Sequence, residues 1–70
     1  DNYLIFMHVF MLKLAADQAE NPNSANQLNG NYNSAMAALR NGEITQVISV
    51  LQDSAHLLEQ NPIDFSKEIK

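Results

Sequence analysis

The sequence contains no cysteine and no tryptophan, and only four of its 70 residues are Lys or Arg. Without cysteine the chain has no disulfide, no thiolate ligand for a metal ion and no thiol nucleophile. The absence of thiols fits a cytoplasmic protein as well as a secreted one. Eight acidic residues give a formal net charge of −4. Because the four basic residues are scattered, no positive stripe is available for phosphates, and we expect no nucleic acid partner.

Long apolar runs are also missing, with one partial exception at residues 3–16. This stretch, YLIFMHVFMLKLAA, holds twelve apolar residues out of fourteen, interrupted by His8 and Lys13. A helix that spans a membrane needs about 20 mainly apolar residues. The run is too short for that and carries a lysine, so we expect no membrane span.

Glycine and proline are scarce, and their positions divide the chain. Proline disfavours helical geometry in the residue before it, so the Asn-Pro pairs at 21–22 and 61–62 indicate helix ends. The Asn-Gly pair at 41–42 suits a helix C-terminus. The sequence therefore predicts a single all-α domain over residues 1–70, either a three-helix bundle or an extended helical hairpin with a short C-terminal tail. The expected helices lie near 2–20, 24–41 and 43–60.

The two later helices show apolar residues at helical spacing. In 43–60 the predicted core face is Ile44, Val47, Ile48, Leu51, Ala55 and Leu58, and Val50 and Leu57 widen it along one flank. In 24–41 the face is Leu28, Tyr32, Ala35, Met36 and Leu39. Six asparagines lie between residues 21 and 33, so we expect the second helix either to be capped by Ser24 with first turns that fray or order only against a neighbour, or to begin near Asn31.

The helix expected near 2–20 is apolar on every side. Its residues form three stripes: Leu4, Met7, Met11, Leu14; Ile5, Val9, Leu12, Ala16; and Tyr3, Phe6, Phe10. A helix that is hydrophobic all round is normally buried all round. Two other helices cover two stripes at most, so we expect another chain to cover the rest, either a copy of this one or a helical partner. The predicted contact residues are Tyr3, Phe6, Met7, Phe10, Met11, Val50 and Leu57.

The tail after Pro62 holds Phe65 and Ile69, four residues apart. Such a pair predicts a final turn that either packs on its own domain or contacts a partner. Small domains without disulfides commonly rely on such contacts, because a short chain buries only about 60% of its unfolded surface.

Catalytic and metal chemistry find little support in the sequence. His56, with Asp53 and Glu59 on one helical face and Leu58 two residues on, resembles the phosphoacceptor histidine of phosphotransfer domains, but Glu59 and Gln60 replace the lysine and glycine that follow that leucine there. His8 lies between Leu4 and Leu12, where a buried neutral histidine is the ordinary outcome. We expect a non-catalytic protein without metal or cofactor, and keep phosphotransfer at His56 as an alternative.

Parts of the sequence resemble two known families. The stretch at 41–62, NGEITQVISVLQDSAHLLEQNP, resembles the second helix of a tetratricopeptide repeat. The stretch at 20–36, ENPNSANQLNGNYNSAM, is similar to the turn and following tyrosine-bearing helix of needle and filament subunits of bacterial type III secretion systems, and VISVLQD at 47–53 resembles their later apolar segment. The second resemblance implies a short helical hairpin that assembles with copies of itself or is covered by a helical chaperone. No functional residue is carried across from either family.

Overall fold

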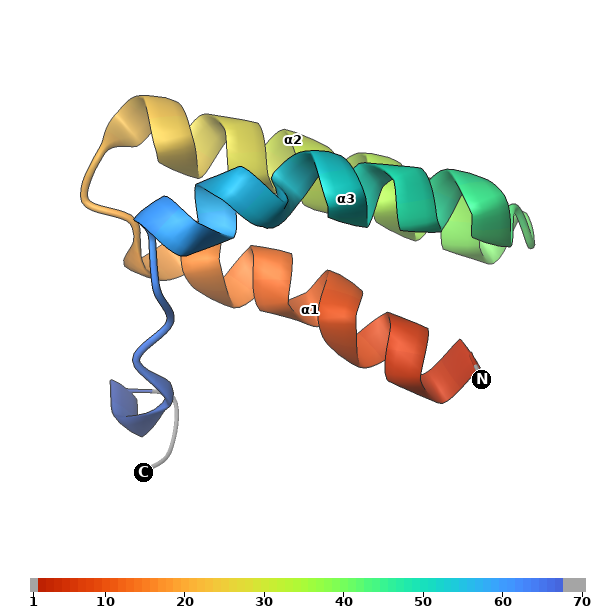
Figure 1. Ribbon diagram of the computed structural model, residues 1–70, viewed down its shortest axis with the longest axis horizontal. Coiled ribbons are helices and arrows are strands. Elements are labelled where there is room, and N and C mark those ends of the chain that lie inside the picture. Colours follow the sequence, from red (N-terminus) through yellow and green to blue (C-terminus); the bar gives the residue numbers. More distant parts are fainter. Residues whose placement is uncertain (1, 68–70) are drawn as a thin grey trace.

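A computed structural model describes residues 2–67 as three helices followed by a short 3₁₀ turn (Figure 1). The elements are α1 (Asn2–Gln18), α2 (Pro22–Arg40), α3 (Ile44–Gln60) and η1 (Phe65–Lys67). The described part of the chain contains no strand, which confirms the all-α prediction. α2 lies along α3, and α1 packs mainly against α2 and less against α3. The result is a compact three-helix arrangement.

The second helix begins earlier than the sequence suggested. Asn21 has extended backbone angles (φ −84°, ψ 119°), and its side-chain oxygen accepts a hydrogen bond of 2.8 Å from the backbone N–H of Asn23. Pro22 occupies the first helical turn, where its fixed φ suits the helix and its missing N–H is not needed. The prediction of a Ser24 cap is therefore wrong, and the asparagine-rich segment is helical throughout.

The connection between α2 and α3 is a tight turn at Gly42. Gly42 has φ of 75°, and its N–H donates to the Leu39 carbonyl at 3.1 Å. The N–H of Glu43 donates to the Ala38 carbonyl at 2.9 Å. These bonds satisfy carbonyl groups that the helix end leaves free, and the left-handed backbone favours a residue without Cβ.

The two glycines of the chain are expected to respond to alanine with opposite signs. Gly42→Ala places a Cβ on a left-handed backbone, which should lower the free energy of unfolding by about 1 kcal/mol. Gly30 lies exposed inside α2 with nothing within 4 Å of an added Cβ. Gly30→Ala should therefore raise the free energy of unfolding by roughly 0.5–1 kcal/mol. Urea unfolding of both variants checks the pair, and equal shifts would contradict the turn geometry.

The core combines small and branched side chains from all three helices. Its buried apolar members are Val9, Leu12, Ala15, Ala16, Leu28, Ala35, Ala38, Val47 and Val50. On α2 the predicted face is confirmed, since Leu28 and Ala35 are buried and Tyr32, Met36 and Leu39 pack against them half-buried. This core is small, so each large member contributes a substantial part of the stability.

On α3 the predicted face is confirmed in part, since Val47 is buried and Leu51 and Leu58 pack half-buried against the core, but the most buried side lies closer to the predicted flank. Val50 and Ser54 are buried, whereas Ile48 is 43% exposed and Ala55 is exposed. Ser54 enters the core because its hydroxyl is satisfied there. Its Oγ donates to the Val50 carbonyl at 2.8 Å and accepts from the Asn31 amide at 2.9 Å. A buried polar group that is fully hydrogen-bonded is tolerated, and an apolar periodicity does not reveal it.

Within residues 2–67, only one of the three apolar stripes of α1 is covered by the other elements. Val9, Leu12 and Ala16 are buried and Ile5 is half-buried, which is the second predicted stripe. None of residues 3–8 is fully buried, and in Figure 1 α1 diverges from α3 toward its N-terminus. The residues of the other two stripes are exposed or half-buried.

Candidate functional site

Most exposed large apolar side chains of the molecule lie on α1. Among the described residues they are Tyr3 (76% exposed), Leu4 (56%), Phe6 (40%), Met7 (51%), Phe10 (44%), Ile48 (43%) and Phe65 (51%). Five of the seven belong to the first ten residues, and Phe65 joins them from η1. Single exposed apolar residues are ordinary on protein surfaces, but a contiguous group usually marks a contact site.

These side chains form a groove between α1 and the tail. The apolar groove has a volume of about 320 Å³ and is lined by Tyr3, Phe6, Met7, Phe10, Met11, Leu14 and Phe65. The rings of Phe6 and Phe10 are stacked, with centroids 6.4 Å apart and planes inclined by 13°. The α1 residues recur at three- and four-residue spacing, so they follow one side of the helix over about three turns.

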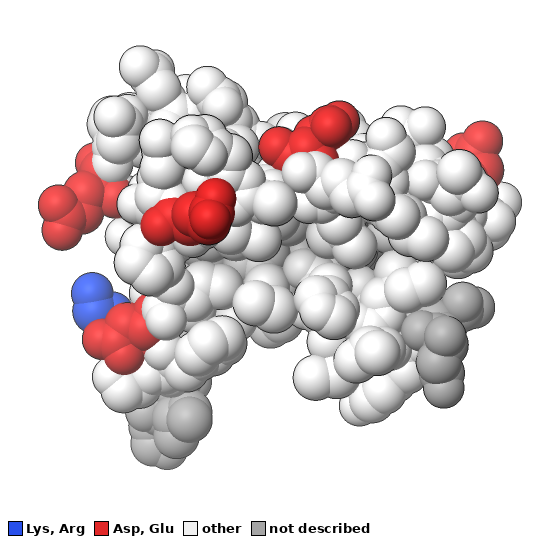
Figure 2. Space-filling model, viewed as in Figure 1, with Lys and Arg blue, Asp and Glu red and all other residues white. Residues whose placement is uncertain are grey.

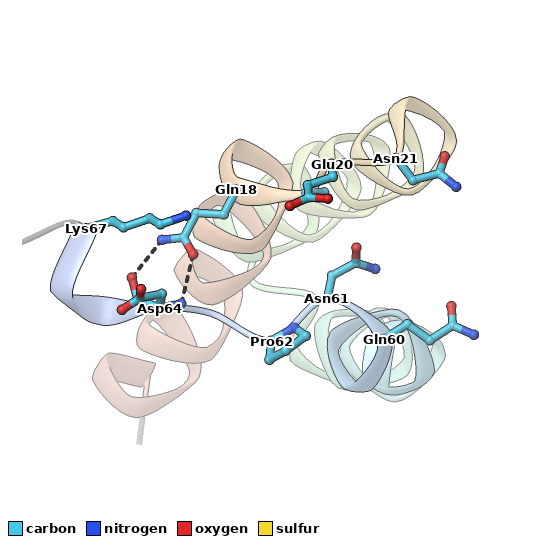
Figure 3. Close-up of a pocket in the computed structure, with 9 residues that line it drawn as sticks. Gln18, Glu20, Asn21, Gln60, Asn61, Pro62, Asp64 and Lys67 are labelled. Atoms are coloured by element: carbon cyan, nitrogen blue, oxygen red, sulfur yellow. Dashed lines mark hydrogen bonds between the residues drawn. The ribbon is translucent and has the colours of Figure 1, made fainter.

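Phe65 forms the wall of the apolar groove opposite α1, and two hydrogen bonds between residues far apart in the sequence hold it there. The side-chain amide of Gln18 donates to the Asp64 carbonyl at 2.9 Å and accepts from the Asp64 N–H at 2.8 Å. Figure 3 shows the two groups facing each other at the end of α1. Because Phe65 follows Asp64 directly, these bonds place its ring beside the C-terminal half of α1.

The same end of the molecule contains a polar crevice of about 400 Å³, where the α1–α2 loop meets the end of α3 and η1. In Figure 3 the Gln18 and Asp64 groups face each other, whereas the Asn21 and Gln60 side chains point away from them. The two hydrogen bonds between Gln18 and Asp64 cross this crevice and hold the tail against the end of α1.

Asp64 also stabilises the turn that follows it. Its carboxylate accepts hydrogen bonds from the Ser66 hydroxyl at 2.6 Å and the Ser66 backbone N–H at 3.0 Å. These bonds to the ionised form, the hydroxyl bond first and then the backbone bond, lower the pKa of Asp64 below its usual 3.8, and Lys67 adds to the effect.

Titration of the Asp64 carboxylate with acid should reveal its hydrogen bonds to Ser66. The stabilisation by the Asp64 carboxylate is present above the unfolded pKa near 3.8 and is lost as the pH falls through the lower folded value. The Ser66 amide resonance should therefore titrate with a midpoint below 3.8. Ser66→Ala removes the hydroxyl bond, so the midpoint should move upward. A wild-type midpoint at or above 3.8 would contradict the turn.

The apolar groove lies on a side of the molecule with little charge. Residues 2–12 contain no Asp, Glu, Lys or Arg. In Figure 2 the acidic side chains lie over the other helices and near η1, while the N-terminal half of α1 shows none. Further along α1, Lys13 pairs with Asp17 at 3.5 Å. The N-terminal half of this face is thus suited to apolar contacts.

The structure separates the residues that the sequence grouped as contacts. Tyr3, Phe6, Met7, Phe10 and Met11 line one groove. Val50 is a core residue, 8% exposed, and Leu57 packs half-buried against the core. Leu14 and Phe65 were missed as members of the groove. The spacing of Leu14 from Met7 and Met11 could have indicated it, whereas Phe65 depends on the Gln18 bonds.

Both histidines lie on the surface. His56 is exposed, its Nε2 lies 3.1 Å from the Gln60 amide, and its Nδ1 lies 3.8 Å from the Glu59 carboxylate. His8 is exposed as well, with Nδ1 3.0 Å from the Leu4 carbonyl, which corrects the expectation of a buried histidine. Within residues 2–67 no group of three His, Asp or Glu side chains is arranged to hold a metal ion.

None of the known protein families, curated proteins and solved structures compared with this chain matches it. Among the helices that the structure describes, none is long and apolar enough to cross a membrane. The functional conclusion therefore depends on the geometry of the apolar groove and its surroundings.

Proposed function

We propose that this chain is a non-catalytic interaction or assembly module that binds another protein through the apolar groove of α1. The observation that carries the proposal is the clustering of six exposed large apolar side chains on one side of a 70-residue domain. Aromatic and methionine side chains are the residues that protein interfaces concentrate, and a few aromatic anchors commonly supply most of the binding energy.

Two further features support this proposal. The exposed stripes of α1 lie on a helix whose buried stripe already anchors it, so the exposed residues are not needed to hold α1 in place. The tail adds Phe65 to the same groove through the bonds between Gln18 and Asp64. A protein surface that is fixed before binding loses less conformational entropy on association.

A narrower candidate is a subunit of a helical assembly, as the resemblance to needle and filament subunits implies. The hairpin of α1 and α2, closed at Asn21 and Pro22, and the uncovered α1 favour it. The break at Gly42 departs from it, because it divides the remaining chain into two helices. Electron microscopy of the concentrated protein distinguishes a filament subunit from a general interaction module, since only the filament subunit is expected to form filaments.

Site-specific photo-crosslinking tests the proposed function. A benzophenone amino acid replaces Phe10 in one variant and Ile48 in another, and both are irradiated in extracts of cells that express the chain. The two positions are equally exposed, 44% and 43%, but only Phe10 lies in the apolar groove. We expect defined protein adducts from position 10 and none from position 48.

The adduct from position 10 identifies the partner by mass spectrometry, whether it is this chain or another protein. An excess of unlabelled native chain should suppress it if the contact is specific. Adducts of equal yield at both positions, or none at position 10, would refute the proposed function.

A further inference from the structure

We infer that the occupant of the apolar groove is a second copy of this chain, bound with its α1 antiparallel to the first in a closed two-fold dimer. The inference depends on the proposed function, because it names the partner of the same surface. Three observations favour a second copy: the area that the surface offers, its lack of charge, and the different shapes of its two ends.

The exposed area is close to what one side of a small dimer interface needs. A large apolar side chain presents on the order of 200 Å² when free, so the six exposed residues of α1 and η1 offer roughly 600 Å². Standard interfaces bury about 800 Å² per partner, and weak or transient ones bury less. Two copies of this surface therefore suffice for a reversible dimer without any residue from the acidic sides.

Charge favours this face for contact between copies. Each chain carries a net charge of −4, so two copies repel when acidic sides approach. Residues 2–12 contribute no Asp, Glu, Lys or Arg. The N-terminal half of α1 offers a charged partner no Asp, Glu, Lys or Arg to pair with, and residues 9–14 of a second copy bring only Lys13 to it, so no two like-charged side chains meet there.

The two ends of the face differ in a way that selects the antiparallel arrangement. At one end Phe65 stands beside the C-terminal half of α1, fixed by the Gln18 bonds. At the other end Tyr3 and Leu4 are the most exposed large apolar residues. In an antiparallel pair each Phe65 covers the open end of the other copy. In a parallel pair the two tails would meet, and both open ends would stay uncovered.

The absence of native cysteine allows a direct test of this pairing. Antiparallel α1 helices centred between residues 8 and 9 bring Tyr3 of one copy next to Leu14 of the other. Single-cysteine variants Tyr3→Cys and Leu14→Cys are oxidised separately and as an equimolar mixture. We expect the mixture to yield several times more disulfide-linked dimer than either variant alone, with Ile48→Cys as the matched exposed control.

Light scattering of the native chain completes the test without any substitution. Its mass should rise from 7.8 kDa toward twice that value with concentration and then stop. A constant 7.8 kDa at all concentrations would overturn the dimer, and so would masses that keep growing. Self-linking of Tyr3→Cys above the mixture would overturn the antiparallel arrangement. A photo-adduct with a different protein at position 10, together with a monomeric mass, would leave the proposed function standing and refute this inference alone.

Discussion

Leu12→Ala is expected to remove roughly half of the free energy of unfolding at 25 °C. Leu12 is a fully buried core residue of α1. Truncation of a buried leucine costs about 2–5 kcal/mol, through lost transfer free energy and the cavity left behind. A domain of 70 residues has a total free energy of unfolding of only roughly 4–10 kcal/mol. Circular dichroism during urea unfolding measures the loss.

Leu4→Ala is the matched control, since it removes the same atoms from the same helix. Leu4 is 56% exposed and outside the core. We expect its free energy of unfolding to change by less than about 0.5 kcal/mol at concentrations where the chain is monomeric. If the two substitutions lowered the free energy of unfolding equally, the assignment of buried and exposed stripes on α1 would be incorrect.

Phe10→Ala is expected to weaken association strongly while the helices remain intact. Phe10 lies in the apolar groove, stacked on Phe6. Aromatic anchors near the centre of an interface commonly contribute more than 1 kcal/mol, so the dissociation constant should rise about fivefold or more. Sedimentation over a concentration series measures it, and circular dichroism verifies the helical content.

Ile48→Ala provides the comparison for Phe10→Ala. Ile48 is as exposed as Phe10 but lies on α3, apart from the apolar groove. Its truncation should leave the dissociation constant unchanged. Loss of helicity in Phe10→Ala with association unaffected would make the ring a structural residue of α1 instead of a contact.

The helices were largely predictable from the sequence, because Asn-Pro and Asn-Gly pairs mark their ends by local backbone chemistry. The start of α2 was harder. Propensity alone argued against a helix through six asparagines, but Asn21 caps it and Asn31 binds Ser54 of α3. Tertiary contacts of this kind override propensity, and a single sequence does not show them.

The part of the contact surface that lies on α1 was predictable from the sequence. Tyr3, Phe6 and Phe10 stand at helical spacing, and their shared face follows from the sequence. Phe65 reaches the same groove only because Gln18 binds Asp64, which lies 46 residues away along the chain. Val50 was assigned to the contact on spacing alone, but α3 turns it into the core beside Ser54.

Hydrogen exchange of the α1 backbone shows whether another chain covers the exposed side of this helix. None of residues 3–8 is fully buried, and we propose that another chain covers their apolar side. In dilute solution the amides of residues 6–8 should exchange much faster than those of residues 13–17, and their protection should rise as the concentration increases or a partner is added. Equal, concentration-independent protection along the whole of α1 would mean that the chain encloses this helix unaided, and would contradict the account.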